Sequence, residues 1–516
     1  MANITLNQLQ KEALEQIRSS RKSLLYGVTG SGKTEVYQSI IEDTLKKDKN
    51  VLLLIPEIAL TIQTTHRLEK IFPTVVWHSQ ITPKKKKEII HTIKKETGYL
   101  IIGTRSSLFL PIKNLGAIII DEEHDYSYKQ ETNPRYHAVK CAEYLADNLD
   151  IPLVLGSATP SIETAYTAWK NANMAIVTLK ERFYGEMPDI ETINLRDEYG
   201  SGKNHFISTK LLNAMKQTLF ENEQVMLFLN RRGWGHYVQC ETCGHVEMCP
   251  RCDVSLTPHH DNLLRCHYCG YKKNIIQTCS ECTAPTLKFQ GVGLQKVANY
   301  LQKAFPDKTI IRMDTDTTKN KEVIKQMYHD FKDKKAHILI GTQIVKGFDF
   351  PNVKLVGIIS ADDSINFPEF RSVERTFQLL MQAAGRAGRR EKKGKVIIQT
   401  YQPTHPIFKF IKSHNYKEFF TYELEQRKEL NYPPFSRLLR IIISGKNKEK
   451  VITESEKIYN ALQAEEKYLP TPALIEKLHN KLRYTILCKN PKKVPPPQRN
   501  TKDFSIVYDY DPISFV

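Results

Sequence analysis

The chain has 516 residues and a formal net charge of +18, with 75 Lys and Arg residues against 57 Asp and Glu residues. This length fits roughly three or four domains, and no apolar run reaches the ~20 residues that a membrane-spanning helix needs. The excess of basic residues favours a polyanionic partner such as nucleic acid, although a generally lysine-rich composition gives the same balance. We therefore expect a soluble, cytoplasmic protein of several domains.

The first functional motif lies at residues 23–34, where an apolar strand runs into a glycine turn and a predicted helix. It matches the phosphate-loop pattern G-x-x-x-x-G-K-[ST] without a mismatch. Its backbone N–H groups would surround phosphates at a helix N-terminus, with the lysine on the β- and γ-phosphates and the threonine hydroxyl on Mg²⁺. The loop comprises Gly27, Val28, Thr29, Gly30, Ser31, Gly32, Lys33 and Thr34.

A pair of carboxylates follows the apolar run at residues 117–120. Such a run is typical of a buried parallel strand, whose C-terminal end is where α/β sheets bind ligands. We predict that Asp121 holds Mg²⁺ and that Glu122 orients and deprotonates the attacking water. A solvated acidic loop is the alternative.

Shortly before the phosphate loop, Gln10 could read the adenine edge, although a surface glutamine is the more common interpretation.

Other segments of this region suit nucleic-acid contacts. Residues 54–61, 102–106 and 156–160 each follow an apolar strand and offer small hydroxyl or backbone donors for a sugar-phosphate backbone. Aromatic and cationic residues alternate over 125–130 and 135–137, as expected of side chains that stack on unpaired bases. A packed loop is the alternative for these aromatic residues.

Four Cys-x-x-Cys pairs lie within residues 240–282. Each pair can offer two thiolates to one tetrahedral ion, so the four pairs predict two Cys₄ zinc sites. A disulfide framework is the alternative, which the absence of a signal peptide pattern disfavours. The spacing does not choose between nested and sequential pairing of the following cysteines: Cys240, Cys243, Cys249, Cys252, Cys266, Cys269, Cys279 and Cys282.

A second α/β unit surrounds the cysteine cluster, with apolar strand patterns at 225–229, 338–342 and 353–359. Its last motif contains Gln382, Arg386 and Arg389. The two arginines are three residues apart on one helix face, so both can point at a γ-phosphate held by the first unit. A basic helix that faces nucleic acid is the alternative.

This ordered set of motifs resembles superfamily 2 helicases of the DExH type. Together with residues 121–125, 127–130, 366–371, 374–380 and 432–438, it resembles the family of primosomal replication-restart helicases. The resemblance implies ATP-dependent 3′-to-5′ DNA helicase or translocase activity at stalled forks, with ATP, Mg²⁺ and two Zn²⁺ as cofactors. It also implies DNA, primosome and single-stranded-DNA-binding proteins as partners. For the cysteines it implies nested pairing, with one ion on Cys240, Cys243, Cys279 and Cys282 and another on Cys249, Cys252, Cys266 and Cys269.

We therefore predict two RecA-like α/β lobes, a two-zinc insertion in the second lobe and a small α/β C-terminal domain, in a monomer. The expected domains are residues 1–180 (lobe 1), 181–239 (linker and start of lobe 2), 240–282 (zinc insertion), 283–429 (rest of lobe 2) and 430–516 (C-terminal domain).

Three departures from the family pattern affect how DNA would be bound. The family normally carries a 3′-end-binding domain and a winged helix before the motor, whereas the phosphate-loop lysine is residue 33 in this sequence, and the motifs at 291–295 and 341–349 are altered. We expect fork binding mainly through the motor and the zinc insertion. A non-unwinding scaffold with an ATP switch and an RNA helicase are the alternatives.

Overall fold

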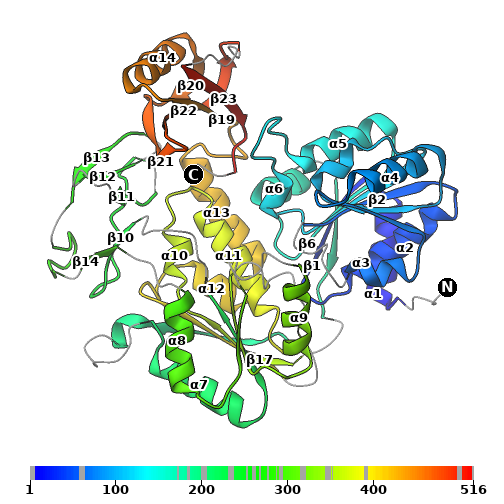
Figure 1. Cartoon of the computed structure of the whole chain (residues 1–516), viewed down its shortest axis with the longest axis horizontal. Coiled ribbons are helices and arrows are strands. Elements are labelled where there is room, and N and C mark those ends of the chain that lie inside the picture. The colour runs from blue at the N-terminus through cyan, green and yellow to red at the C-terminus, as the bar shows by residue number, and fades with distance from the viewer. Residues whose placement is uncertain are drawn as a thin grey trace.

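The computed structural model describes residues 6–56, 64–170, 174–182, 186–198, 206–229, 237–251, 254–258, 263–266, 269–275, 278–285, 287–289, 294–313, 321–342, 350, 352–388, 393–496 and 503–513. It confirms the predicted fold class: two parallel α/β lobes, a cysteine-rich module and a C-terminal sheet domain (Figure 1). Within the ranges given above, no helix is both long and apolar enough to span a membrane.

The first lobe contains a seven-stranded sheet in the order β3-β4-β2-β5-β6-β1-β7, and every strand pairs in parallel with its neighbours. The central strands are buried along their whole length, as expected of a parallel sheet covered on both faces. The strands are β1 (Lys22–Gly27), β2 (Asn50–Leu54), β3 (Thr74–Trp77), β4 (Leu100–Gly103), β5 (Leu115–Asp121), β6 (Leu153–Ser157) and β7 (Ala175–Leu179).

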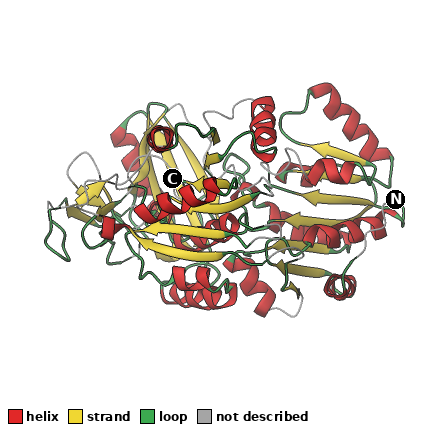
Figure 2. Cartoon of the chain, turned by 90° about the horizontal axis from the view of Figure 1, so that it is seen from below, coloured by secondary structure: helices red, strands yellow, loops and turns green. Residues whose placement is uncertain are grey.

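Helices cover both faces of this sheet, as Figure 2 shows beside the N-terminus. Successive strand residues point to opposite faces, so Leu53 packs in one hydrophobic cluster and Leu52 in the other. The helices of this lobe are α1 (Gln8–Arg18), α2 (Lys33–Leu45), α3 (Thr64–Glu69), α4 (Pro83–Lys95), α5 (Ala138–Leu149) and α6 (Ile162–Lys170), with short 3₁₀ turns η2 (Arg105–Phe109) and η3 (Tyr126–Tyr128).

The second lobe contains a six-stranded parallel sheet in the order β15-β16-β9-β17-β18-β8. Its strands are β8 (Asp189–Asn194), β9 (Gln224–Phe228), β15 (Ile310–Met313), β16 (Ile338–Gly341), β17 (Val353–Ile358) and β18 (Lys395–Thr400). Its helices are η4 (Leu195–Glu198), α7 (Thr209–Phe220), α8 (Leu294–Ala304), α9 (Lys321–Lys332), α10 (Asp362–Ile365), α11 (Ser372–Ala384), α12 (Ile407–Lys412) and α13 (Tyr416–Glu429).

The cysteine-rich module interrupts the second lobe between β9 and α8. It is built from short antiparallel strands: β10 (Val238–Cys240), β11 (Thr257–Pro258), β12 (Leu263–Arg265), β13 (Lys272–Asn274) and β14 (Leu287–Phe289). Its core is continuous with that of the C-terminal domain, because Leu264 and Cys266 share a hydrophobic cluster with Leu438 and Leu487. The module is therefore packed between the second lobe and the C-terminal domain.

The C-terminal domain is an antiparallel sheet in the order β20-β22-β19-β23, with β21 also paired to β22. One face of the sheet packs against α14 around Ile441, Ile443 and Ile458. Its elements are β19 (Leu438–Gly445), α14 (Lys448–Ala461), β20 (Gln463–Lys467), β21 (Thr471–Leu478), β22 (Lys481–Lys493) and β23 (Phe504–Tyr510).

Candidate ATP site and cysteine clusters

The phosphate loop joins the end of β1 to the start of α2. Gly30 and Gly32 have φ angles of +83° and +84°, a left-handed conformation that glycine adopts without strain. The Lys33 Nζ donates to the backbone oxygen of Gly27 at 2.9 Å, so the lysine lies across the loop. Because Lys33 and Thr34 begin a 13-residue helix, the free N–H groups and dipole of α2 favour an anion here.

Gln10 is buried, with 1 % of its surface exposed. Its Nε2 donates to the backbone oxygen of Gly32 at 3.3 Å, and its Oε1 accepts from the Asn7 N–H at 2.9 Å. The amide thus holds the start of α1 against the phosphate loop. The interpretation of Gln10 as a surface glutamine is therefore wrong, whereas contact with adenine stays a prediction.

The two predicted catalytic carboxylates lie at the C-terminal end of β5. The Tyr37 hydroxyl donates to Asp121 Oδ1 at 3.0 Å. Burial and the neighbouring Glu122 raise the pKa of Asp121 to about 6, against the opposing effect of Lys33. Glu122 has a φ of +48°, so the chain turns sharply there. The sequence contained a signal for Tyr37, because it lies four residues after Lys33 on the same helix face.

A chain of polar contacts runs from these carboxylates to the second lobe through His124. Its Nδ1 lies 2.7 Å from Ser157 Oγ and 3.6 Å from Glu122 Oε2. Its Nε2 lies 2.8 Å from Gln382 Nε2 on α11. Because the amide nitrogen of Gln382 donates, His124 Nε2 accepts and Nδ1 carries the proton toward Ser157. Ser157, which we expected to face a sugar-phosphate backbone, instead binds this histidine.

The end of α11 lies against the phosphate loop. A Cβ placed on Gly385 would lie 2.7 Å from Thr29 Cγ2 and 2.8 Å from Thr29 Cβ. This close approach leaves no space for a larger residue at position 385, and the half-buried Arg386 follows it in the chain. Gln382 and Gly385 therefore lie where lobe 2 contacts lobe 1, and the role of Arg386 stays a prediction. Arg389, the second predicted arginine, lies outside the described residues, as do most of the altered motifs at 291–295 and 341–349.

The third carboxylate of the motif, Glu123, binds another part of lobe 1 and does not lie beside Lys33. Its oxygens accept from the Ser161 N–H at 2.7 Å and from the Thr164 hydroxyl at 2.9 Å, at the start of α6. Burial raises the pKa of Glu123 to about 7, although these hydrogen bonds oppose the shift. Glu123 thus binds the first turn of α6 and does not face the phosphate loop as Asp121 does.

The aromatic segment after these carboxylates is packed between domains. Tyr128 is 1 % exposed and Lys129 is 2 % exposed. The Tyr128 hydroxyl donates to the backbone oxygen of Asp121 at 2.6 Å. The Arg375 guanidinium lies 4.2 Å from the ring centroid of Tyr126. The packed-loop alternative is therefore correct for Tyr128 and Lys129, which are too deeply buried to stack on bases.

An ionic cluster joins the two lobes around the buried Arg427 of α13. Its Nη2 lies 2.6 Å from Glu374 Oε2, its Nε 3.0 Å from Glu423 Oε1 and its Nη1 3.4 Å from Glu163 Oε2. Although burial opposes ionisation, Arg371 and Arg427 lower the pKa of Glu163 to about 2. Burial raises the pKa of Glu423 to about 7. Sequence reasoning missed this cluster.

Further contacts at this junction bind α6 of lobe 1 to lobe 2. The Ile162 N–H donates to Glu374 Oε1 at 2.9 Å, and the Tyr416 hydroxyl donates to the backbone oxygen of Pro160 at 2.8 Å. Trp169 packs edge-on against Phe420, with ring centroids 4.2 Å apart. Ile162 also belongs to the main hydrophobic cluster of the second lobe. Helix α6 is thus shared between the two lobes.

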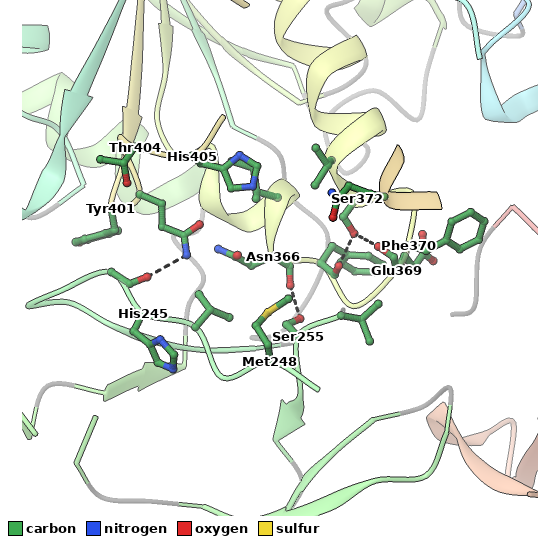
Figure 3. A pocket seen from close by; sticks show the side chains of 18 of the residues that line it. His245, Met248, Ser255, Asn366, Glu369, Phe370, Ser372, Tyr401, Thr404 and His405 are labelled. Atoms are coloured by element: carbon green, nitrogen blue, oxygen red, sulfur yellow. Dashed lines mark hydrogen bonds between the residues drawn. The ribbon is translucent and has the colours of Figure 1, made fainter. Parts of the chain in front are cut away.

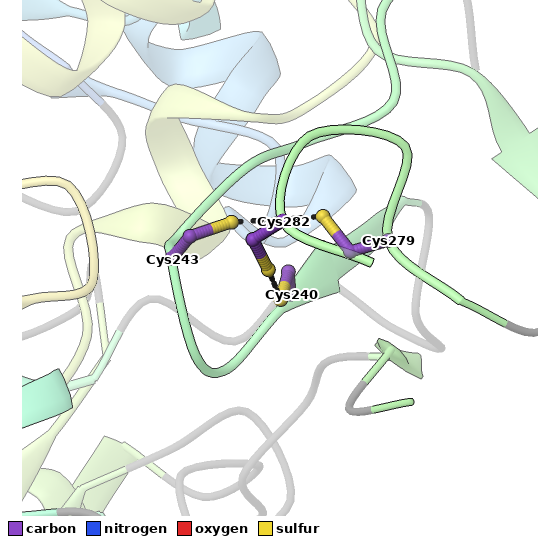
Figure 4. A group of neighbouring side chains, drawn as sticks. All are labelled: Cys240, Cys243, Cys279 and Cys282. Carbon is purple, nitrogen blue, oxygen red and sulfur yellow. Dashed lines mark hydrogen bonds between the residues drawn. The ribbon is translucent and has the colours of Figure 1, made fainter. Parts of the chain in front are cut away.

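Thiols from distant parts of the cysteine-rich module lie together (Figure 4). The Sγ atoms of Cys240 and Cys282 are 3.7 Å apart, and those of Cys243 and Cys279 are 3.6 Å apart. Thiolates 2.3 Å from one tetrahedral zinc ion would be about 3.8 Å apart, whereas a disulfide requires about 2.05 Å. These four thiols therefore fit one zinc ion, and this arrangement agrees with nested pairing.

A second group of thiols contains Cys249, Cys266 and Cys269, with 3.6 Å between the Sγ atoms of Cys249 and Cys269. Cys252, the predicted fourth ligand, lies outside the described residues. The three placed thiols come from the two inner Cys-x-x-Cys pairs. They fit a second zinc ion in the same nested scheme.

Figure 3 shows a cavity of about 680 Å³. Its lining includes Cys243 of the first thiol group and Glu423 and Arg427 of the ionic cluster. On one side, the Gln402 amide donates to the backbone oxygen of Gly244 at 3.0 Å. On another, the Ser255 hydroxyl donates to the backbone oxygen of Asn366 at 2.5 Å. These bonds attach the module to lobe 2 around the rim of the cavity, away from the phosphate loop.

Four family models match the chain in succession. They are the DEAD/DEAH box helicase (residues 7–168), the PriA DNA helicase Cys-rich region domain (249–273), the helicase conserved C-terminal domain (271–391) and the primosomal protein N C-terminal domain (428–501). A solved structure of Mycobacterium smegmatis helicase Lhr bound to ssDNA and AMP-PNP aligns with a TM-score of 0.50 and 15% identity. It covers 80% of this chain and 49% of that one, a likeness of fold alone.

Two relatives, each named replication restart protein PriA, match almost the whole chain. The Bacillus subtilis protein is 41% identical over 502 residues, which is 94% of this chain and 62% of the relative. The Rickettsia felis protein is 41% identical over 497 residues, which is 95% of this chain and 76% of the relative. The chain thus spans less than two thirds of the Bacillus relative. By this similarity, the chain belongs to the PriA family of replication restart proteins.

Proposed function

We propose that this chain is an ATP-dependent DNA helicase or translocase that moves 3′ to 5′ along single-stranded DNA. It acts at stalled or branched forks, in replication restart and primosome assembly. The observation that carries the proposal is the contact of Gly385 with Thr29, because it brings a lobe-2 motif against a complete phosphate loop. A nucleotide between the lobes can then couple its hydrolysis to their relative movement. Membership of the PriA family supports the DNA substrate and the polarity.

The residues of the cleft have separate roles in this proposal. Lys33 binds the β- and γ-phosphates, while Thr34 and Asp121 would hold Mg²⁺, which neutralises charge on the phosphates when bound. Glu122 orients the attacking water and accepts its proton. Arg386 stabilises charge that develops on the γ-phosphate, together with Arg389. Gln10 fixes the loop from the side of α1.

His124 connects this chemistry with the second lobe. Because it contacts both Ser157 and Gln382, a change at the neighbouring Glu122 alters the hydrogen bonds of β6 and α11 together. Ligand-dependent movement requires a contact that differs between two states of the lobes. We assign that role to the His124–Gln382 contact.

A strand-displacement assay tests the function. We expect purified protein to open forked DNA in the presence of ATP and Mg²⁺ and to leave the fork intact without ATP. Opening of an RNA fork but not a DNA fork would establish the RNA-helicase alternative. ATP-dependent fork binding without opening would establish the non-unwinding scaffold.

We assign two Zn²⁺ ions to the nested thiol groups, with Cys252 completing the second group. Both sites use only protein thiolates, so the zinc is structural and supplies folding energy, on the order of 10–16 kcal/mol per ion in zinc-finger peptides. We expect metal analysis to find two zinc ions per chain. Cys240→Ser should reduce this to one and damage fork opening more than basal ATP hydrolysis. One ion or none in the unmodified protein would contradict the assignment.

Primosome components and single-stranded-DNA-binding proteins are the partners that this role implies, in the bacterial cytoplasm near the nucleoid. The formal charge of +18 supports contact with DNA backbone. We propose a monomer as the active unit. Analytical ultracentrifugation with and without forked DNA tests the oligomeric state, and a dimer in both conditions would contradict it.

A further inference from the structure

Asp509, near the end of the chain, binds cations from two domains. Its carboxylate lies 3.1 Å from Lys129 Nζ and 3.1 Å from Arg135 Nη1, both in lobe 1, and 3.1 Å from Arg440 Nη2 of the C-terminal domain. The side chains of Lys129 and Asp509 are 2 % and 3 % exposed. One buried carboxylate thus pairs with three neighbouring cations.

The backbone beyond Asp509 extends these contacts to both lobes. The Tyr510 oxygen accepts from Lys129 Nζ at 2.6 Å. The Pro512 oxygen accepts from Arg371 Nη1 at 2.9 Å, and the Ile513 oxygen accepts from Arg375 Nη2. Asp509, Tyr510, Pro512 and Ile513 therefore bind the aromatic segment of lobe 1 and the start of α11 in lobe 2.

In lobe 1, the residue next to Lys129 contacts the end of β5, which carries Asp121. Tyr128, adjacent to Lys129, donates its hydroxyl proton to the backbone oxygen of Asp121 at 2.6 Å, and the same hydroxyl lies 3.1 Å from the backbone oxygen of Leu54. Arg105 fixes the same segment by donating to the backbone oxygens of Ser127 at 2.6 Å and Lys129 at 3.1 Å. A displacement of Lys129 would therefore move the neighbours of Asp121.

The lobe-2 end leads to α11, which carries Gln382. Arg375 lies on α11, contacts the Ile513 oxygen and stacks on Tyr126 of the aromatic segment. The Tyr126 hydroxyl also donates to Gln378 Oε1 at 3.3 Å. The C-terminal residues and the aromatic segment thus fix the helix that presents Gln382 to His124.

We propose that Asp509 is a positioning residue for ATP hydrolysis, and this proposal rests on the proposed function. By pairing with Lys129, Arg135 and Arg440, it keeps the C-terminal strand, the aromatic segment and α11 in their present arrangement. In this proposal it acts through these segments and does not itself contact the nucleotide or the attacking water. Without its charge, three cations face one another at short range in a poorly solvated site, and their repulsion separates the segments.

The variant Asp509→Asn removes the charge with little change of shape. With saturating single-stranded DNA, we expect kcat for ATP hydrolysis to fall by about 2- to 30-fold, the size of effect that residues along such a connection produce. KM for ATP should stay within about twofold, because the phosphate loop is unchanged. A raised KM with unchanged kcat would overturn the proposal.

Asp511→Asn is the matched control, because Asp511 lies two residues further and forms an exposed pair with Arg437. It should leave kcat and KM as in the unmodified protein. If Asp509→Asn does not fold, Arg135→Gln removes a less buried member of the cluster, and we expect a smaller fall in kcat in the same direction. Unchanged kcat in Arg135→Gln and in a folded Asp509→Asn would also overturn the proposal.

Hydrogen exchange without nucleotide or DNA separates this proposal from the proposed function. We expect the amides of residues 126–137 to exchange faster in Asp509→Asn than in Asp511→Asn. Equal protection in the two variants would show that Asp509 does not hold this segment. If the unmodified protein lacks DNA-stimulated ATP hydrolysis, the proposed function fails. The exchange result still shows whether Asp509 holds residues 126–137 in place.

Discussion

The phosphate loop and the Arg427 cluster are two polar sites of this chain, and they are built in opposite ways. Lys33 and Thr34 lie within a contiguous segment of 27–34, between a strand and a helix that follow one another in the chain. The cluster unites Glu163 of lobe 1 with Glu374, Glu423 and Arg427 of lobe 2. The first site is complete within one lobe, whereas the second exists only when the lobes are together.

The two sites therefore have different roles. The loop can bind an anionic ligand, since Lys33 and the start of α2 present positive charge to solvent. The cluster needs no ligand, because each of its carboxylates already pairs with a guanidinium or accepts from a backbone N–H. Changes at the loop should therefore alter turnover without altering stability, and changes at the cluster should do the reverse.

The largest expected effect is that of Lys33→Ala. Turnover should be abolished because the β- and γ-phosphates lose their cation, whereas affinity for single-stranded DNA should stay largely intact. Steady-state ATP hydrolysis and fluorescence anisotropy with labelled DNA measure the two properties. Turnover near that of the unmodified protein would remove the loop from the proposed mechanism.

Arg386→Ala tests the lobe-2 side of the same cleft. We expect a fall in turnover on the order of 10³-fold, with ATP affinity much less affected, because this contact strengthens in the transition state. Pre-steady-state kinetics and nucleotide titration separate the effects. Preserved turnover with a loss of DNA affinity would instead favour the basic helix that faces nucleic acid.

Arg427→Met tests the cluster. Removal of the guanidinium leaves Glu374 and Glu423 buried without their cation, which should cost about 3–5 kcal/mol of unfolding free energy. Urea denaturation monitored by circular dichroism measures this cost. Arg437→Met is the matched control, because Arg437 forms an exposed pair and should change the free energy by at most about 1 kcal/mol. Similar costs in the two variants would show that the cluster does not stabilise the junction.

The smallest expected effect concerns pH. Because the pKa of Glu423 is raised to about 7 in the folded protein, the folded state binds its proton more tightly than the unfolded chain does. Stability from this group is present at low pH and is lost as pH rises through about 7. Between pH 6 and 8, Tm should therefore fall less in Glu423→Gln than in the unmodified protein.

Glu425→Gln serves as the control for this pH experiment. Glu425 is exposed on the same helix, so the variant should keep the pH dependence of the unmodified protein. Zinc in excess at each pH keeps loss of metal from contributing to the difference. Identical pH profiles in all three proteins would exclude Glu423 as a titrating group.

The sequence alone predicted the parts that are contiguous in the chain. A strand, a glycine turn and the helix that begins at Lys33 specify a phosphate loop through local backbone geometry. The Cys-x-x-Cys pairs likewise specify pairs of zinc ligands. Their spacing left the nested pairing open, because it depends on how the strands of the module cross, and the grouping of Cys240 with Cys282 required three dimensions.

Tertiary structure decided which partner each remaining charged side chain has. Lys129 looked like a ligand for nucleic acid, but it is buried against Asp509, which lies 380 residues away in sequence. Arg427 gave no signal, because an isolated arginine in a helix pattern is most often exposed. The physical reason is that a buried ion pair depends on the low dielectric and the geometry of a particular junction. The sequence determined the chemistry of the loop and the thiols, and only the packing of the domains determined how they are held together.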